Sequence, residues 1–491
     1  MGGLRKYLGD LFQPTAEYEQ ASWLFLKGLA LVYVATFLSL AVQIEGLAGS
    51  DGILPFRAFL DEGFARYGYA AWLRLPNLFW LNCSDVALQG AAIAGALLAV
   101  LLLLGWGRQR PILILLFVLY LSLYHAGQVF TNFQWDFLLL ESGFLAIFLV
   151  DGPTRLVIFL YHWLLFRLRF LSGLSKLASG DPSWSGFTTL NHYFETQPLP
   201  HVGSWYAHQL PQWLLKTGVG FTYFAELIVP FFIFLPRPFR VFAAATTILI
   251  QLLILATSNH NFINLLTILL CLFLLDDRIV GKLLPRACRN RQLDLFRPRL
   301  PGLRVKALSG TAAVLTLAIS LSQMYPMLTR RPLPPALYAF STLGPRYGIG
   351  NVYHVFPTMQ TERQELQIAG SYDGVHWQPY VFRYKPGALD KAPAFIVPYQ
   401  PRLDWMMWFV PPQRRDMGPW FTRFVDALAD NKPAVSHLLA YNPFEGRAPP
   451  RFLRVDAYRY RFTTPKERAE SGNWWQAEYL GEFPNVPPRR P

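Results

Sequence analysis

The sequence predicts a multi-pass α-helical membrane domain of about nine spans, followed by an α+β soluble domain with a β-sheet core. The chain has 491 residues, of which 53% are apolar and only 15% are charged. Soluble domains carry about 25% charged residues, so this chain is poor in charge for its length. Nearly all of the long apolar runs lie before Tyr325, which separates a membrane half from a soluble half.

A helix needs about 17–25 apolar residues to cross a bilayer. Two of the predicted spans, 136–150 and 261–275, are short, so each either re-enters the membrane or is extended by flanking polar residues. The predicted spans are 21–43, 86–105, 111–130, 136–150, 155–171, 217–235, 239–257, 261–275 and 306–325. The predicted domains are a transmembrane helical domain at 1–325, a Pro/Gly-rich linker at 326–350 and an extracytoplasmic α+β domain at 351–491.

The loops predict the orientation through their Lys and Arg content. If the N-terminus is cytoplasmic, the inner segments hold sixteen Lys and Arg residues, nine of them in the loop 276–306. The outer loops 44–85 and 172–216 hold only five. Positively charged loops stay in the cytoplasm. Nine spans then place the C-terminal domain outside, in the periplasm of a bacterium or the lumen of a eukaryotic endoplasmic reticulum.

The composition also excludes several classes of protein. The net charge of +14 divides equally between residues 1–325 and 326–491, and neither half contains a nucleic-acid-binding motif. We therefore expect no nucleic-acid partner. Three cysteines without a C-x-x-C pair argue against a thiol–disulfide enzyme and against a zinc site. No P-loop, G-x-S-x-G or H-E-x-x-H motif occurs, and the sequence predicts no cofactor and no metal.

Polar, aromatic and histidine residues gather in three predicted outer loops. The turn after the third span contains Trp135 and Asp136, and the turn after the seventh span is Ser258-Asn259-His260-Asn261. The long loop after the fifth span contains Lys176, Asp181, Trp184, His192 and Glu195. An ordinary aromatic belt with solvated loops explains any one of these residues. Their concentration on one membrane face favours a site.

Charged residues also lie inside the predicted spans, where they are costly and often functional. These residues are Glu141, Arg167, Arg169 and Glu226. The simpler interpretation is that they form buried ion pairs that hold the helices together.

Lys176 has two interpretations. If the fifth span continues as a helix, Arg169, Ser172 and Lys176 share one face. A desolvated lysine near another cation becomes a base or a nucleophile, and His192 and Glu195 would accept or relay its proton. Alternatively, Lys176 only caps the helix end, where the carbonyls favour a cation, and the other two residues tie down the loop. Lys176, His192 and Glu195 are therefore the candidate catalytic residues.

The C-terminal domain shows the patterns of strands and helices. Apolar residues alternate on both sides of Asp373-Gly374, which predicts a β-hairpin. A long strand is predicted at 452–463, with arginines beside aromatic residues, and helices are predicted at 403–410 and 417–440.

Five long stretches resemble the lipase maturation factor family. They are SGDPSWSGFTTLNHYFETQPLP (179–200), GSYDGVHWQPYVFRYKPG (370–387), VPYQPRLDWMMWFVPP (397–412), NPFEGRAPPRFLRVDAYRYRF (442–462) and SGNWWQAEYLGEF (471–483). Counted from the turn at 131, the resemblance spans most of the chain. It implies a membrane protein that helps secreted lipases, or other exported clients, to fold and assemble.

The same resemblance suggests candidate binding residues and partners. Arg402 and Asp404 are expected to orient a platform of Trp405 and Trp408 that faces the client or the membrane. The full set of candidate binding residues is Trp135, Asp136, Asp181, Trp184, Arg402, Asp404, Trp405 and Trp408. Membrane lipids are the second expected partner. Because no retrieval signal follows PNVPPRRP, we expect a bacterial member with a periplasmic domain rather than an endoplasmic-reticulum protein.

A shorter stretch, GLSKLASGDPSW (173–184), resembles the Lys-containing segment of the vitamin K-dependent γ-carboxylase and related membrane domains. That resemblance implies a catalytic base at Lys176. Two hypotheses follow. The leading one is a non-enzymatic membrane maturation factor, and the alternative is a membrane enzyme acting on a lipid, quinone or peptide at the outer loops.

Overall fold

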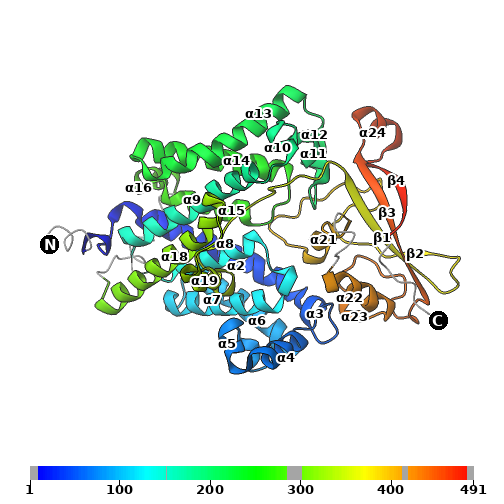
Figure 1. The fold of residues 1–491 in the computed structure, drawn as a ribbon, viewed down its shortest axis with the longest axis horizontal. Coiled ribbons are helices and arrows are strands. Elements are labelled where there is room, and N and C mark those ends of the chain that lie inside the picture. The colour runs from blue at the N-terminus through cyan, green and yellow to red at the C-terminus, as the bar shows by residue number, and fades with distance from the viewer. Residues whose placement is uncertain (1–8, 151, 285–300, 412–417, 484–491) are drawn as a thin grey trace.

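The structure is a computed structural model that describes residues 9–150, 152–284, 301–411 and 418–483. A bundle of helices forms most of the molecule, and a sheet with a few short helices lies at one end of it (Figure 1). The first described residues, from Gly9, and the short helix α16 (Asp277–Leu283) lie at the end of the bundle farthest from the sheet (Figure 1).

Seven helical segments in the described part of the chain are long and apolar enough to cross a membrane. They include α2 (Glu19–Ala41), α6 (Asp85–Leu104), α7 (Gln109–Ala126), α9 (Arg155–Ala178), the segment Gln212–Phe234 that begins with α13 (Gln212–Tyr223), α14 (Arg237–Thr257) and α18 (Leu303–Thr329). The prediction of a multi-pass helical domain is confirmed, and the count of about nine spans is not.

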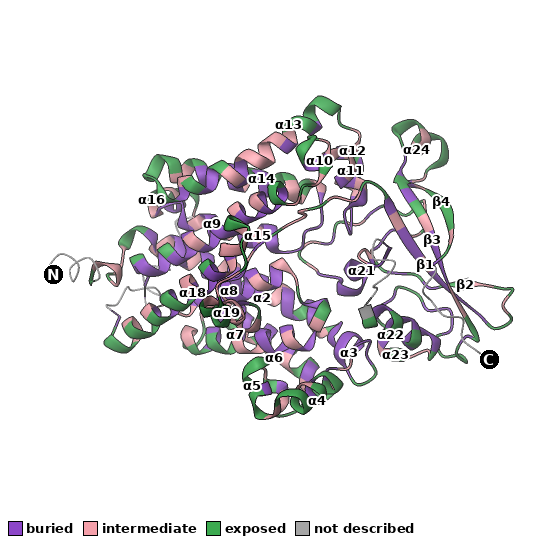
Figure 2. Cartoon of the chain, viewed as in Figure 1, coloured by how far each residue is buried: buried purple, intermediate pink, exposed green. Residues whose placement is uncertain are grey.

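The two predicted spans that fall short are α8 (Gln134–Ala146) and α15 (Ile263–Leu270). At 1.5 Å per residue, the 13 residues of α8 extend about 20 Å, which is less than the ~30 Å of a hydrocarbon core. Most of α8 is buried among longer helices (Figure 2). Just past its end, the carbonyl of Ile147 accepts a hydrogen bond from Arg110 at the start of α7 (3.2 Å). A short helix suffices here because its neighbours, rather than lipid, surround it.

Local sequence signals set the ends of the long helices. The Ser84 hydroxyl accepts the N–H of Ala87 at the start of α6, and Gly105 ends that helix with φ 75°. Glycine adopts this left-handed conformation without a steric penalty. Thr154 caps α9 in the same way as Ser84 caps α6. The loops predicted to lie outside fold into short helices: α3 (Ile44–Ala48), α4 (Phe56–Tyr67), α5 (Ala71–Arg74), α10 (Pro182–Ser185), α11 (Thr189–Thr196) and α12 (Val202–His208).

The predicted linker at 326–350 is largely helical. The last span, α18, continues through Pro326 to Thr329. Two short helices then follow, α19 (Pro335–Ser341) and α20 (Leu343–Tyr347). Pro335 begins α19 rather than preventing it, because the first helical turn needs no N–H from proline.

The C-terminal domain is built on a four-stranded antiparallel sheet with the order β2-β1-β3-β4. Its strands are β1 (Arg363–Ser371), β2 (Gln378–Pro379), β3 (Phe452–Phe462) and β4 (Trp475–Glu482). The predicted hairpin is confirmed, because β1 pairs with β2 across Asp373-Gly374. The predicted strand at 452–463 is β3. Strand β4 was not predicted, and it forms an edge of the sheet.

Four short helices complete this domain: α21 (Arg402–Met407), α22 (Gly418–Ala429), α23 (Pro433–Ser436) and α24 (Pro465–Ser471). The predicted helix at 403–410 corresponds to α21, and the one at 417–440 is divided into α22 and α23. Phe421 and Phe424 of α22 share one apolar cluster with Val455 of β3, so the sheet and the helix have a common core.

The C-terminal domain is bonded directly to the membrane domain. The buried guanidinium of Arg363 donates hydrogen bonds to the carbonyls of Glu195, Gln197 and Pro198 (2.9, 2.5 and 3.0 Å). Asn259, in the turn after α14, accepts the N–H of Ile396 (3.0 Å). These contacts fix the C-terminal domain against one end of the bundle.

Candidate functional site

A cavity of about 100 Å³ lies between α9, α14, α15 and the turn that follows α13. Lys176, Arg169 and Glu226 line it, together with apolar and aromatic side chains. Trp184 covers Lys176, whose ammonium lies 5.2 Å from the centre of the indole ring. The cavity is therefore a charged space inside an otherwise apolar part of the molecule.

Glu226 is the partner of Lys176. The Lys176 ammonium donates to Glu226 Oε2 (2.8 Å) and to the carbonyl of Ser172 (3.2 Å). Arg169 Nη2 lies 3.5 Å from Glu226 Oε1. All three charged side chains are at least nine-tenths buried. Two cations thus share one carboxylate, which leaves a net charge of +1 beside the cavity.

The backbone brings Glu226 to this position through an unusual turn. Residues Phe224–Ile228 form a π-helical turn, a feature often found at functional sites. Gly173 of α9 packs against it, and a Cβ atom at position 173 would lie 2.8 Å from the Cβ of Glu226. Only glycine therefore allows this close approach of the two helices.

A second polar group lies on the same cavity wall. The Tyr193 hydroxyl is hydrogen-bonded to His260 Nε2 (2.7 Å) and to Ser258 Oγ (2.9 Å). Burial, and then the positive charge of Lys176, lowers the pKa of His260 to about 3. The imidazole is therefore neutral at any physiological pH.

A larger cavity of about 640 Å³ adjoins the first, and the two share the lining residues His260, Ile263, Val355 and Phe356. Its other walls are mainly aromatic and come from both domains, including Trp135 of α8, Trp405 of α21 and Trp408. The Trp135 and Trp405 rings meet edge to face, 4.9 Å apart. Three of the predicted binding residues thus lie together on the wall of one cavity.

Arg402 does not face this cavity or the solvent. Its guanidinium is fully buried and donates to both oxygens of Asp136 (2.7 and 3.0 Å) and to the carbonyl of Phe130 (2.7 Å). The Tyr120 hydroxyl donates to the same carboxylate. Asp404 accepts the N–H groups of Tyr384 and Lys385 (2.7 and 2.9 Å), and burial raises its pKa. The ion pair of Arg402 with Asp136 therefore joins the C-terminal domain to the helical bundle. Asp404 fixes the loop that contains Tyr384 and Lys385.

Asp181 and Trp184 bind the chain segment that enters the C-terminal domain. Asp181 accepts the N–H of Met359 (2.8 Å), and the Trp184 indole donates to the carbonyl of Phe356 (3.1 Å). This segment closes one side of both cavities, so the two residues support the site.

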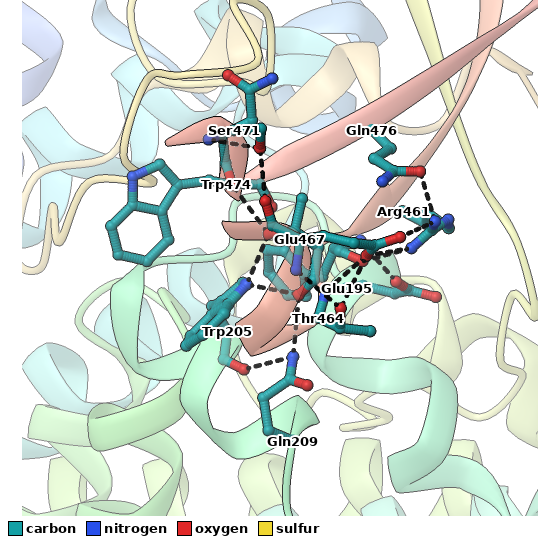
Figure 3. A network of polar contacts seen from close by, with 12 residues as sticks. Glu195, Trp205, Gln209, Arg461, Thr464, Glu467, Ser471, Trp474 and Gln476 are labelled. Carbon is teal, nitrogen blue, oxygen red and sulfur yellow. Dashed lines mark hydrogen bonds and ion pairs between the residues drawn. The ribbon is translucent and has the colours of Figure 1, made fainter. Parts of the chain in front are cut away.

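His192 and Glu195 are not brought to Lys176. Glu195 instead accepts the N–H of Phe462 in β3 (3.0 Å) and lies 3.6 Å from His208. Figure 3 shows Glu195 beside Arg461 and Thr464 of the C-terminal domain. Helix α11 thus directs Tyr193 towards the first cavity and Glu195 towards the sheet. Among the described residues, no hydrogen bond joins His192 or Glu195 to Lys176, so the three predicted catalytic residues do not form one constellation.

Other interactions near the site confirm the simpler interpretation of the intramembrane charges. Glu141 is paired with Arg167, and the Tyr353 hydroxyl donates to Glu141 Oε2 (3.0 Å).

The sequence analysis did not predict the hydrogen bond between Tyr193 and His260. Within the described ranges, no group of three or more His, Cys, Asp or Glu side chains is arranged to hold a metal ion.

The fold and the site define a class: a multi-pass helical membrane protein with an α+β domain docked on one end and a charged cavity beneath the junction. Two family models match the chain, the lipase maturation factor transmembrane domain at residues 20–282 and the lipase maturation factor C-terminal domain at residues 349–485. The chain belongs to the lipase maturation factor family.

Individual relatives agree with this assignment. The chain is 34% identical to lipase maturation factor 2 of Gallus gallus, over 94% of this chain and 80% of the relative. It is 33% identical to lipase maturation factor 1 of Bos taurus, over 93% of this chain and 87% of the relative. It is also 33% identical to lipase maturation factor 2 of Homo sapiens, over 94% and 81%. No solved structure matches the chain.

Proposed function

We propose that this protein is a membrane-embedded maturation factor that binds an exported lipase or another secreted client through its C-terminal domain. The observation that carries the proposal is the family match, which extends across both the membrane domain and the C-terminal domain. The docking contacts support it, because they hold the C-terminal domain against one end of the helical bundle. The domain faces the endoplasmic-reticulum lumen or the periplasm.

The edge of the sheet is the surface best suited to a client that is still folding. Strand β4 pairs with β3 on one side, and among the described residues no strand pairs with its other side. An edge strand offers unpaired N–H and C=O groups to an extended peptide. Tyr479 of β4 is 56% exposed, and an aromatic side chain beside such an edge is a typical anchor.

Replacing Tyr479 with alanine should weaken client binding by about 2 kcal/mol, since truncating an aromatic anchor removes contact area at the centre of an interface. The measurement is recovery of a co-expressed secreted lipase by chemical cross-linking in membranes, together with its secreted activity. Tyr441→Ala is a matched control, because Tyr441 is equally exposed at 56% but lies outside the sheet. Equal recovery with both variants would argue against the β4 edge.

The orientation is tested by reporter fusions after residues 290 and 480. We expect opposite sides of the membrane, with position 290 cytoplasmic, because positive loops stay inside. Position 290 lies outside the described residues, but α16 just before it is at the end of the bundle opposite the sheet (Figure 1). Reporters on the same side would contradict the proposal.

A second candidate function is a membrane enzyme that uses Lys176. The observation that favours it is the position of Lys176 on a cavity wall, paired with the carboxylate of Glu226. The bonds of Lys176 to Glu226 and Ser172 are also those of a purely structural lysine. The variants described in the Discussion distinguish the two functions.

A further inference from the structure

The small cavity beside Lys176 has more positive than negative charge. Lys176 already uses Glu226 as its partner at 2.8 Å, whereas Arg169 lies at 3.5 Å from the same carboxylate. Within the described part of the chain, neither Nε nor Nη2 of Arg169 has a hydrogen-bond partner. Buried guanidinium groups are normally hydrogen-bonded, so donors that have only a long ion-pair contact beside a cavity require an explanation.

An anionic group in the cavity provides that explanation. Arg169 lines the cavity and its side chain is only 7% exposed. A carboxylate is the natural ligand of a guanidinium, because it accepts charge-assisted hydrogen bonds from two of its nitrogens. One such anion would also balance the net charge of +1 left by Lys176, Arg169 and Glu226.

The adjoining cavity is larger, and its walls are mainly aromatic. Its volume of about 640 Å³ lies within the ~300–1,000 Å³ typical of ligand pockets. Trp135, Trp405 and Trp408 contribute large aromatic surfaces to its walls. His260, Ile263, Val355 and Phe356 line both cavities, so a molecule that extends from one into the other has to pass between these side chains. It would need an anionic end and a long apolar end.

We propose that the two cavities together bind a long-chain carboxylate, with its carboxylate on Arg169 and its hydrocarbon chain along the aromatic cavity. A zwitterionic phospholipid fits less well, because its cationic headgroup would meet Arg169 and Lys176. The inference concerns a ligand inside the protein and is independent of the client surface proposed above.

The test uses the full-length protein in nanodiscs of phosphatidylcholine and a palmitate analogue that carries a photoactivatable diazirine near its methyl end. We expect labelling of peptides that contain residues 402–409 or 133–135. Unlabelled palmitate should compete at least tenfold better than hexadecanol, which has the same chain without the charge. Labelling elsewhere, or equal competition by hexadecanol, would overturn the proposal.

Two further competitors identify the source of the negative charge. Inorganic phosphate should not compete, because it has no chain to occupy the aromatic cavity. Phosphatidylglycerol should compete weakly. If it competes as well as palmitate, the ligand is an anionic phospholipid and the carboxylate assignment is wrong.

A variant then tests the role of Arg169. Arg169→Gln should reduce labelling at least tenfold, while Arg57→Gln, which removes a solvent-exposed guanidinium from an outer loop, should leave it unchanged. Unchanged labelling in folded Arg169→Gln would exclude Arg169 as the anion-binding group. If that variant does not fold, the competition series with the native protein decides the question alone.

Discussion

Replacing Arg402 with alanine should destabilise the protein by about 3–5 kcal/mol, because it leaves the carboxylate of Asp136 buried without its cation. Both side chains are fully buried, and two hydrogen bonds of 2.7 and 3.0 Å join them across the two domains. We expect a large loss of thermal stability in detergent and faster proteolysis of the C-terminal domain than of the bundle.

Arg57→Ala is the control for this experiment. Arg57 also pairs with an aspartate, Asp61, but its side chain is 71% exposed, and such surface pairs contribute about 0–1 kcal/mol. The double variant Arg402→Met with Asp136→Leu should recover part of the stability, since it removes both buried charges. A melting temperature in Arg402→Ala similar to that of Arg57→Ala would show that the pair does not hold the domains together.

Substitutions of Lys176 are expected to have the second large effect on folding and client maturation. Lys176→Glu places a second carboxylate beside Glu226, so two like charges face each other in a buried site and only Arg169 remains to offset them. We expect loss of folded protein and of client maturation. Lys176→Arg keeps the positive charge but cannot act as a base at neutral pH. It should retain folding and client maturation.

These two variants separate the candidate functions when insertion, melting temperature and secreted lipase activity are measured together. Survival of maturation in Lys176→Arg favours a structural lysine and a non-enzymatic factor. Loss of maturation in a Lys176→Arg protein that still inserts and melts normally would favour proton transfer by Lys176.

The positions of the long helices followed from the sequence because lipid requires long apolar runs, a constraint that each segment must satisfy by itself. The β1–β2 hairpin was predictable for the same reason, since Asp373-Gly374 and its flanking alternation are local signals. The strand β4 lacked such a signal, and its pattern of burial is irregular because one side of it is an exposed edge.

The partners within the site could not be predicted in this way. Glu226 is 50 residues from Lys176 along the chain, and it reaches the lysine only through the π-helical turn and the space left by Gly173. The sequence placed Glu195 near Lys176 because both belong to one loop. Tyr193 of helix α11 faces the cavity while Glu195 bonds to β3, and these directions depend on how the helix packs against the sheet.

The pairing of Asp136 with Arg402 spans 266 positions of the chain. A ribosome therefore delivers the aspartate to the membrane long before the arginine that neutralises it exists. Glu141 depends partly on a late residue too, because Tyr353 donates to it. The bundle remains an incomplete intermediate throughout synthesis of the later spans, and only arrival of the C-terminal domain completes it. Chains that terminate after α18 are thus expected to be recognised as unassembled and degraded, even though every long span has been inserted.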